Sequence, residues 1–305
     1  MLRGIRSVFK SQKNPLKSLY INTINKRFCS TELPPELQAT EVLLDLLRYD
    51  NNERGNLWFQ RFYNSLKTAS LKGDIEPQVL TGPDSMPYFR LATPHYGEKF
   101  ENYTFSNSKF LNFCVDHGLG AIIFNSPHAA EVADFDVVSY HLVTFGEVLS
   151  FKKYKSFFGD PKDLFEIQER QLHPSIAAET DWHGSIIPPD DQFLPKESRE
   201  FLKTYINTVT DDIRVPRVAM KVDPSQPMNG FPSRILTINY TVEDFPTKDD
   251  AEVFLEYVQW FLPPSMNVSL LQSKKMLEFI EEEDSPFIVI DSYDEYTNVE
   301  SIDKS

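Results

Sequence analysis

Three runs of apolar residues with different spacing follow one another between residues 86 and 125. A short apolar run at 88–92, a helically spaced run at 109–117 and a second apolar run at 121–124 follow one another. Ser106 stands where it can accept from the first free amides of the helix, and Gly118 suits a left-handed helix end. The pattern predicts a strand, a helix and a strand that form a compact βαβ-like unit.

The rest of the first half predicts further helices and strands. Apolar residues at three- and four-residue steps predict two helices near the start, at 34–47 and 57–69. A short strand fits residues 78–80 between two turn clusters. Looser alternation over 136–150 predicts one or two more strands.

The second half of the chain also predicts a mixture of helices and strands. We expect a helix at 196–209, strands at 217–222 and 234–240, and a helix that begins with the capping-box-like Thr247-Lys-Asp-Asp250 and ends at Pro263. A strand at 266–271, a helix at 273–283 and a last strand at 287–290 follow. Between the halves, residues 159–195 open with a short helix to about Leu172 and are otherwise irregular and rich in proline.

These elements predict an α+β fold with two mixed α/β domains in tandem and helices at the N-terminal end. The predicted domains span residues 29–158 and 196–298, joined by the connector 159–195, and residues 299–305 form an acidic tail. A chain of 305 residues with 41% apolar residues has enough apolar material for two ordinary cores. No run of 18 apolar residues occurs, so no transmembrane segment is predicted.

The first 28 residues form a basic leader. They contain seven Lys and Arg residues and no acid, and the first acidic residue is Glu32. Apolar residues recur in it at roughly helical spacing, as in an amphipathic presequence: Leu2, Ile5, Val8 and Phe9. The leader predicts a mitochondrial transit peptide, with the matrix as destination and cleavage after Phe28. The other interpretation is a basic tail without an address.

Charge narrows the choice of partner. Loss of the seven basic leader residues leaves 24 of the 31 Lys and Arg against 45 Asp and Glu, a net charge of about −21. Such a chain lacks the basic surface that nucleic acids and anionic membranes require. A basic protein partner is favoured, although acidity can also serve solubility alone.

The strongest chemical candidates are Cys114 and His117. They stand three positions apart on the predicted helix, so they can share a face as a thiolate pair or as half a metal site. Cys114 also belongs to the apolar stripe, where a small buried side chain is the common outcome. Cys29 is the only other cysteine and lies at the predicted cleavage site, which excludes a disulfide framework.

Other polar patterns carry less information. Four histidines lie within residues 95–141 but none has the spacing of a zinc motif. Asp181-Trp-His183 suits a turn in the connector, and acids at 131–136 suit a solvated loop. The glycines at 118 and 120 follow a helix, whereas a dinucleotide loop follows a strand. The sequence therefore predicts no metal site and no cofactor.

Several segments together are similar to one known family. Their shared feature is their place in the order of elements: 61–71, 87–93, 120–125, 144–150, 235–239, 249–262 and 285–287. In this order the chain resembles the SseB family, named for enhanced serine sensitivity, whose members pair an N-terminal and a C-terminal α+β domain. The resemblance implies that fold and brings no catalytic residues with it.

The expected function is that of a non-catalytic mitochondrial protein that acts by binding, in assembly or regulation, with an acidic surface towards a basic protein. The alternative is a thiol or sulfur-transfer enzyme that uses Cys114 as nucleophile and His117 as base. Accessibility of the thiol separates the two. The sequence does not predict an oligomeric state.

Overall fold

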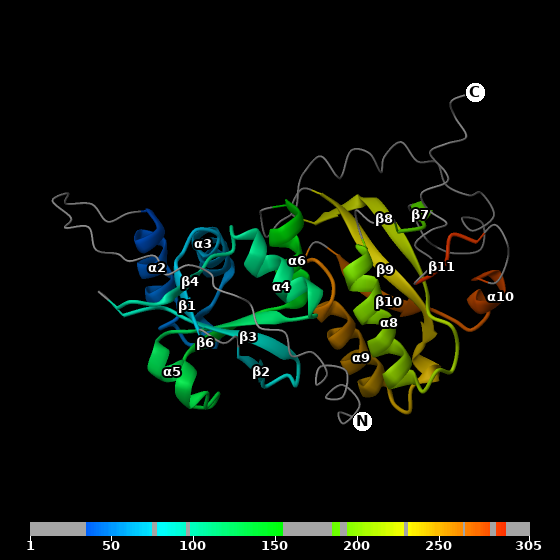
Figure 1. The fold of residues 1–305 in the computed structure, drawn as a ribbon. Helices are drawn as coiled ribbons and strands as arrows, with labels where there is room; N and C mark the ends of the chain where they lie inside the picture. The colour runs from blue at the N-terminus through cyan, green and yellow to red at the C-terminus, as the bar shows by residue number, and fades with distance from the viewer. Residues whose placement is uncertain are drawn as a thin grey trace. The chain divides into compact units, whose positions relative to one another are not determined.

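The computed structural model (Figure 1) describes residues 35–74, 78–95, 98–154, 185–189, 194–228, 231–264, 266–280 and 285–290. These residues fall into two compact units, unit 1 up to Tyr154 and unit 2 from Ser185 onwards. Each unit combines helices with one mixed sheet, so the predicted α+β class is confirmed. The predicted leader, the short helix to Leu172 and the acidic tail lie outside the described residues.

Unit 1 contains a sheet in the order β4-β1-β3-β5-β6, with β2 also paired to β3. Its central strands β3 and β5 are parallel, and the other described pairs are antiparallel. Helix α4 lies between these two strands in the chain, so the predicted strand, helix and strand are confirmed, with the short strand β4 added before the helix. The strands are β1 (Leu71–Gly73), β2 (Val79–Thr81), β3 (Pro87–Ala92), β4 (Glu101–Tyr103), β5 (Gly120–Phe124) and β6 (Tyr140–Val143).

The helices of unit 1 cover both faces of this sheet. Figure 1 shows α4 and α5 on opposite sides of the strands. Adjacent residues of β3 demonstrate the same division, because the Phe89 ring packs 5.3 Å from Phe110 of α4 whereas Arg90 donates to Ala130 O of α5 at 3.2 Å. The helices are α2 (Pro35–Leu46), α3 (Asn56–Leu66), α4 (Ser108–Asp116), α5 (Pro127–Val132) and α6 (Phe145–Tyr154), and η1 (Asn51–Glu53) is a 3-10 turn.

Two local predictions in unit 1 need correction. The N-cap of α4 is Asn107, whose side chain accepts from Lys109 N at 2.9 Å, and Ser106 lies one position too early. The segment 136–150 holds only one strand, because Thr144 and Glu147 bond reciprocally and begin α6. The predicted helix end is confirmed, since Gly118 has a φ of 63°.

Unit 2 contains a sheet in the order β10-β9-β8-β11, with β7 also paired to β8. Strand β10 is parallel to β9, and the long strands β8 and β9 form an antiparallel hairpin. Strand β7 lies within the segment expected to be irregular, where pairing with β8 gives it a place in the sheet. The strands are β7 (Ser185–Ile187), β8 (Arg217–Met228), β9 (Phe231–Thr241), β10 (Asn267–Leu271) and β11 (Ile288–Val289).

The helices of unit 2 are α8 (Lys196–Thr210), α9 (Lys248–Trp260) and α10 (Met276–Ile280). The predicted cap of α9 is confirmed, because the Thr247 hydroxyl accepts from Asp250 N at 3.1 Å. Tyr240 of β9 packs towards Phe254 of α9, and the buried Ala219 of β8 clusters with α10. No helix among the described residues is long and apolar enough to cross a bilayer.

Candidate functional site

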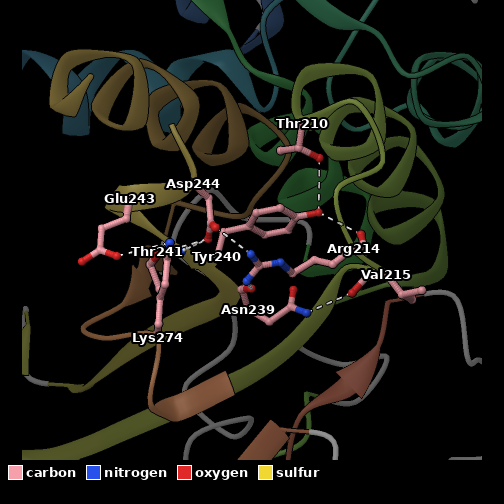
Figure 2. Close-up of polar contacts among 9 residues, drawn as sticks. All are labelled: Thr210, Arg214, Val215, Asn239, Tyr240, Thr241, Glu243, Asp244 and Lys274. Atoms are coloured by element: carbon pink, nitrogen blue, oxygen red, sulfur yellow. Dashed lines mark hydrogen bonds and ion pairs between the residues drawn. The ribbon is translucent and has the colours of Figure 1, made fainter. Parts of the chain in front are cut away.

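In unit 2 a polar network joins the turn after α8 to the end of β9 (Figure 2). Arg214 lies at its centre, where its Nη2 is 2.6 Å from Asp244 Oδ1 and its Nη1 donates to Asn239 O at 3.0 Å. The Asp244 side chain is only 6% exposed and the Arg214 side chain 22% exposed. A charge-assisted bond in so dry a setting fixes both side chains.

Backbone groups of both segments are bound into the same network. Asp244 Oδ2 accepts from Thr241 N at 2.7 Å, which caps the 3-10 turn η4 (Val242–Asp244). The Tyr240 hydroxyl donates to Arg214 O at 3.0 Å, and Asn239 Nδ2 donates to Val215 O at 2.9 Å. The two segments are therefore held together by several bonds rather than by one ion pair.

Apolar side chains stand exposed on these fixed segments. Ile213 is 55% exposed, Val215 59% and Val242 44%. All three are β-branched, so little side-chain freedom is lost when a partner covers them. Ile213 and Val215 flank Arg214 in the chain, and Val242 directly follows Thr241 in the network. We name the exposed residues Ile213, Val215 and Val242 the unit 2 patch.

Acidic residues accompany the unit 2 patch. Asp211, Asp212 and Glu243 are all exposed and are its neighbours in the chain. Asp211 and Asp212 have φ values of 50° and 54° where they end α8, and Lys274 lies 3.3 Å from Glu243 as a surface pair. Exposed apolar residues with acidic neighbours in the chain suit an apolar segment that carries positive charge.

A second polar cluster lies in unit 1 between α3, β6 and α6. The Tyr63 hydroxyl donates to Glu147 Oε1 at 2.8 Å and lies 3.2 Å from His141 Nε2. Glu147 Oε2 accepts from Thr144 N at 2.9 Å. On the other side of the imidazole, Arg54 Nη1 is 3.5 Å from His141 Nδ1. Both carboxylate oxygens and both ring nitrogens thus have partners within the protein.

The direction of these bonds follows from the donors present. Arg54 can only donate, so we assign His141 Nδ1 as acceptor and its Nε2 as the protonated nitrogen. Nε2–H then donates to the Tyr63 oxygen, whose own hydrogen goes to Glu147. The hydrogen bonds therefore form a series in which each group donates to the next, from the partly exposed guanidinium of Arg54 to the carboxylate of Glu147.

Burial perturbs the pKa of each ionisable group in the cluster. Desolvation raises the pKa of Glu147 to about 7, against the opposing effect of hydrogen bonds from Tyr63 and Thr144 N. Desolvation, and then the charge of Arg54, lower the pKa of His141 to about 3. The pKa of Tyr63 is raised well above its usual value, first by burial and then by Glu147. His141 is therefore neutral at physiological pH and a weak base.

Perturbed pKa values often mark catalytic sites, but the surroundings here explain them structurally. The His141 ring lies 4.4 Å from Phe62 and 5.0 Å from Trp58, and the guanidinium of Arg54 covers Trp58 at 4.8 Å. Aromatic rings therefore pack directly against the imidazole. The cluster ties three elements of unit 1 together.

The predicted pair Cys114 and His117 does not form a reactive site. The Cys114 side chain is fully buried, and burial raises the pKa of its thiol well above its usual value. His117 lies at the C-terminal cap of α4, where Nδ1 is 2.8 Å from Phe113 O. The interpretation of Cys114 as a core residue is confirmed, and the thiol-enzyme alternative gains no support, because a buried neutral thiol is a poor nucleophile.

The remaining histidines and acids stay apart. Among the described residues, no group of three His, Cys, Asp or Glu side chains is arranged to hold a metal ion. His141 joins the Glu147 cluster, whereas His128 is exposed on α5. The Asp134 carboxylate accepts from Asp136 N at 3.2 Å in a surface turn, as expected for a solvated loop. Asp181-Trp-His183 lies outside the described residues.

A small hollow lies between β3 and α5 of unit 1. Its volume is about 50 Å³, which is room for a water molecule or two, whereas small-molecule sites usually occupy about 300–1,000 Å³. Both cations of its lining are already paired, since Arg90 Nη2 is 2.7 Å from Asp74 and Lys72 forms an ion pair with Glu98. The hollow offers no free cation for an anionic ligand.

Sequence reasoning singled out neither the unit 2 patch nor the role of Glu147. The spacing Thr144-x-x-Glu147 is a capping-box signal that was present in the chain. The exposure of Ile213, Val215 and Val242 had no such signal, because β-branched residues beside strands are usually buried. No protein-family model, curated protein or solved structure matches the chain.

Proposed function

We propose that this chain is a non-catalytic mitochondrial binding protein and that the unit 2 patch receives a basic, partly apolar segment of a partner protein. The main observation in support is that three apolar side chains are between 44% and 59% exposed on segments fixed by the Arg214 network. A rigid apolar surface reduces the entropy lost on association. Its acidic neighbours favour a basic segment and repel an acidic one.

The location and the family likeness belong to the same proposal. The leader of seven basic and no acidic residues supports import into the matrix, and the net charge of the remaining chain supports a basic partner. Membership of the SseB family is supported by two α+β units in the expected order. A role in assembly or regulation is compatible with two polar clusters, around Arg214 and around Glu147, whose charged groups bond within the protein.

A photocrosslinking experiment tests the proposed surface. A benzophenone amino acid replaces Val215 in one variant and Val253, a 48% exposed residue of α9, in the matched control. Both chains are imported into mitochondria, irradiated and analysed by mass spectrometry. We expect one stoichiometric protein to be crosslinked through position 215, with Lys or Arg in its contact segment, and not through position 253.

Charge reversal completes the test. Replacing Asp211 and Asp212 by lysine should reduce binding of the purified partner at least about tenfold, while Val253→Glu leaves it unchanged. Thermal unfolding distinguishes lost binding from lost folding. Equal crosslinking at both positions, an acidic contact segment, or full binding after charge reversal would refute the proposed surface.

The mitochondrial location is tested separately. We expect residues 1–35 to direct a fluorescent reporter into mitochondria, and the native mature chain to begin near Cys29 or Ser30. A cytosolic reporter and an intact Met1 would contradict the proposed location, while the test of the surface with purified partner would stand.

A further inference from the structure

The sheet of unit 1 ends at β6, and the outer edge of this strand has features that the unit 2 patch does not share. Among the described strands, β6 pairs with β5 alone. Asn125 N donates to Ser139 O at 3.0 Å, and the register then places Ile123 opposite His141. In an antiparallel pair every second residue bonds to the neighbour. The N–H and C=O groups of Tyr140 and Leu142 therefore point away from β5.

A hydrogen bond from Arg54 shows that the Tyr140 carbonyl points away from β5. Its Nη1 donates to Tyr140 O at 3.0 Å, while Nε and Nη2 donate to Tyr49 O at 3.2 and 3.1 Å. The Tyr140 carbonyl is thus on the outer edge, and one of the four outward groups is already bound by this arginine. Because a carbonyl oxygen has two lone pairs, it keeps a second acceptor site.

Exposed apolar side chains lie on the segments next to this edge, in α3 and in the loop before β6. Leu57 is 70% exposed, Phe59 38% and Val137 79%. Phe59 of α3 lies near the strand, since its ring is 6.1 Å from that of His141. Val137 precedes β6 by three positions, and Leu57 lies in the first turn of α3. Natural edge strands are usually protected by charge or covering elements, so this combination points to a binding role.

Exposed acids lie beside the same edge. Asp50 and Glu53 belong to the turn around η1, and Asp134 and Asp136 belong to the loop before β6. Asp136 acts on Tyr140, whose pKa is raised first by burial and then by that carboxylate. Arg54 keeps its positive charge, because both groups it binds are neutral backbone carbonyls. Against the four carboxylates named above, the charge of these five residues together is negative.

We propose that the outer edge of β6 binds an extended segment of a partner protein by strand addition, and that this segment alternates apolar with basic residues. Main-chain bonds to Tyr140 and Leu142 give the affinity, Leu57, Phe59 and Val137 contact the apolar residues, and the acids select the charge. The strand has four residues, so the contact is short and suited to a transient complex. It acts independently of the unit 2 patch.

The probe is a short fluorescein-labelled peptide in which valine and lysine alternate. We expect saturable binding to the full chain in fluorescence anisotropy, with slower hydrogen exchange at the amides of Tyr140 and Leu142. The same peptide with N-methyl groups on every second residue loses the main-chain bonds without any change to the protein. It should bind about tenfold more weakly, because the hydrogen bonds that its N–H groups donate to the edge of β6 are lost.

Variants of the chain locate the contact. Leu57→Ser with Phe59→Ser should weaken binding, whereas Val253→Ser, at an exposed position of α9, should leave it unchanged. Equal affinity of the N-methylated peptide, protection elsewhere in the chain, or equal binding of a valine–glutamate peptide would overturn the proposal. Protection of the Tyr140 and Leu142 amides without peptide that disappears on dilution would overturn it too, because the occupant would then be a second copy of this chain.

Discussion

Replacing Glu147 by glutamine should change the pH dependence of the stability of unit 1. Burial raises the pKa of Glu147 to about 7 in the folded chain, against an ordinary value of 4.5. The stabilisation by the bound proton is fully present below pH 4.5 and is lost as pH rises through 7, because the folded chain holds the proton more tightly than the unfolded chain. At about 1.4 kcal/mol for each pH unit, the loss is about 3 kcal/mol.

His141 has the opposite effect. Burial and Arg54 lower its pKa to about 3 from an ordinary value of 6.5. Its contribution to the free energy of unfolding is therefore present above pH 6.5 and is lost as pH falls towards 3. Between pH 4.5 and 6.5 in the natural chain, Glu147 makes the free energy of unfolding fall with rising pH, whereas His141 makes it rise. When Glu147 is replaced, only the rise due to His141 remains.

Urea unfolding followed by the fluorescence of Trp58 measures this difference. Trp58 is buried in unit 1 and stacks 4.8 Å from Phe62, and replacing Trp182 and Trp260 by phenylalanine isolates its signal. From pH 4.5 to about 8.5, the free energy of unfolding of Glu147→Gln should rise by about 3 kcal/mol relative to the parent. Any cost of the glutamine that does not depend on pH cancels in this comparison.

The matched control is Glu41→Gln, at an exposed position of α2. Its curve should run parallel to that of the parent over the whole pH range. If the Glu147→Gln curve is parallel as well, the carboxyl group titrates normally. The claim that burial outweighs the hydrogen bonds from Tyr63 and Thr144 N would then be wrong.

Three further changes test other parts of the structure. Asp244→Ala should lower the free energy of unfolding of unit 2 by about 3 kcal/mol in urea, because Arg214 is left largely buried without its carboxylate, and Arg214→Met in addition should recover part of this loss. Cys114 should react with iodoacetamide only after denaturation, and rapid labelling of the native chain would restore the case for thiol chemistry. Gly120→Ala should destabilise unit 1 by about 2–3 kcal/mol in the same urea assay, because its Cβ would lie 2.5 Å from Val143 O, and an unchanged midpoint would show that the strands separate easily.

The sequence predicted those elements whose signals are local. The stripe of α4, its glycine stop and the Thr247 cap of α9 all depend on residues within a few positions of one another, and each is confirmed. Of the strand order, the sequence predicted only that β3 and β5 are neighbours, because these two apolar runs lie on either side of one short helix. Strand β7 was missed because its identity depends on pairing with β8, more than 30 positions away in the chain.

The candidate sites were harder to predict because their partners are distant in the chain. Tyr63 and Glu147 are 84 positions apart, and Arg214 and Asp244 are 30 apart. Local spacing drew attention to Cys114 and His117 instead, where the apolar stripe correctly indicated burial. Exposure of Val215 and Ile213 follows from the turn after α8 and cannot be deduced from hydrophobicity alone.

Both proposed surfaces depend on an arginine that binds backbone carbonyls. Arg214 donates to Asn239 O beside the unit 2 patch, and Arg54 donates to Tyr140 O at the edge of β6. In each place the charge is used to fix a segment, and the exposed apolar side chains next to it remain available to a partner. Stability and binding should therefore be separable: replacing the arginine weakens folding first, whereas replacing Val215 or Phe59 by serine removes binding from a chain that still folds.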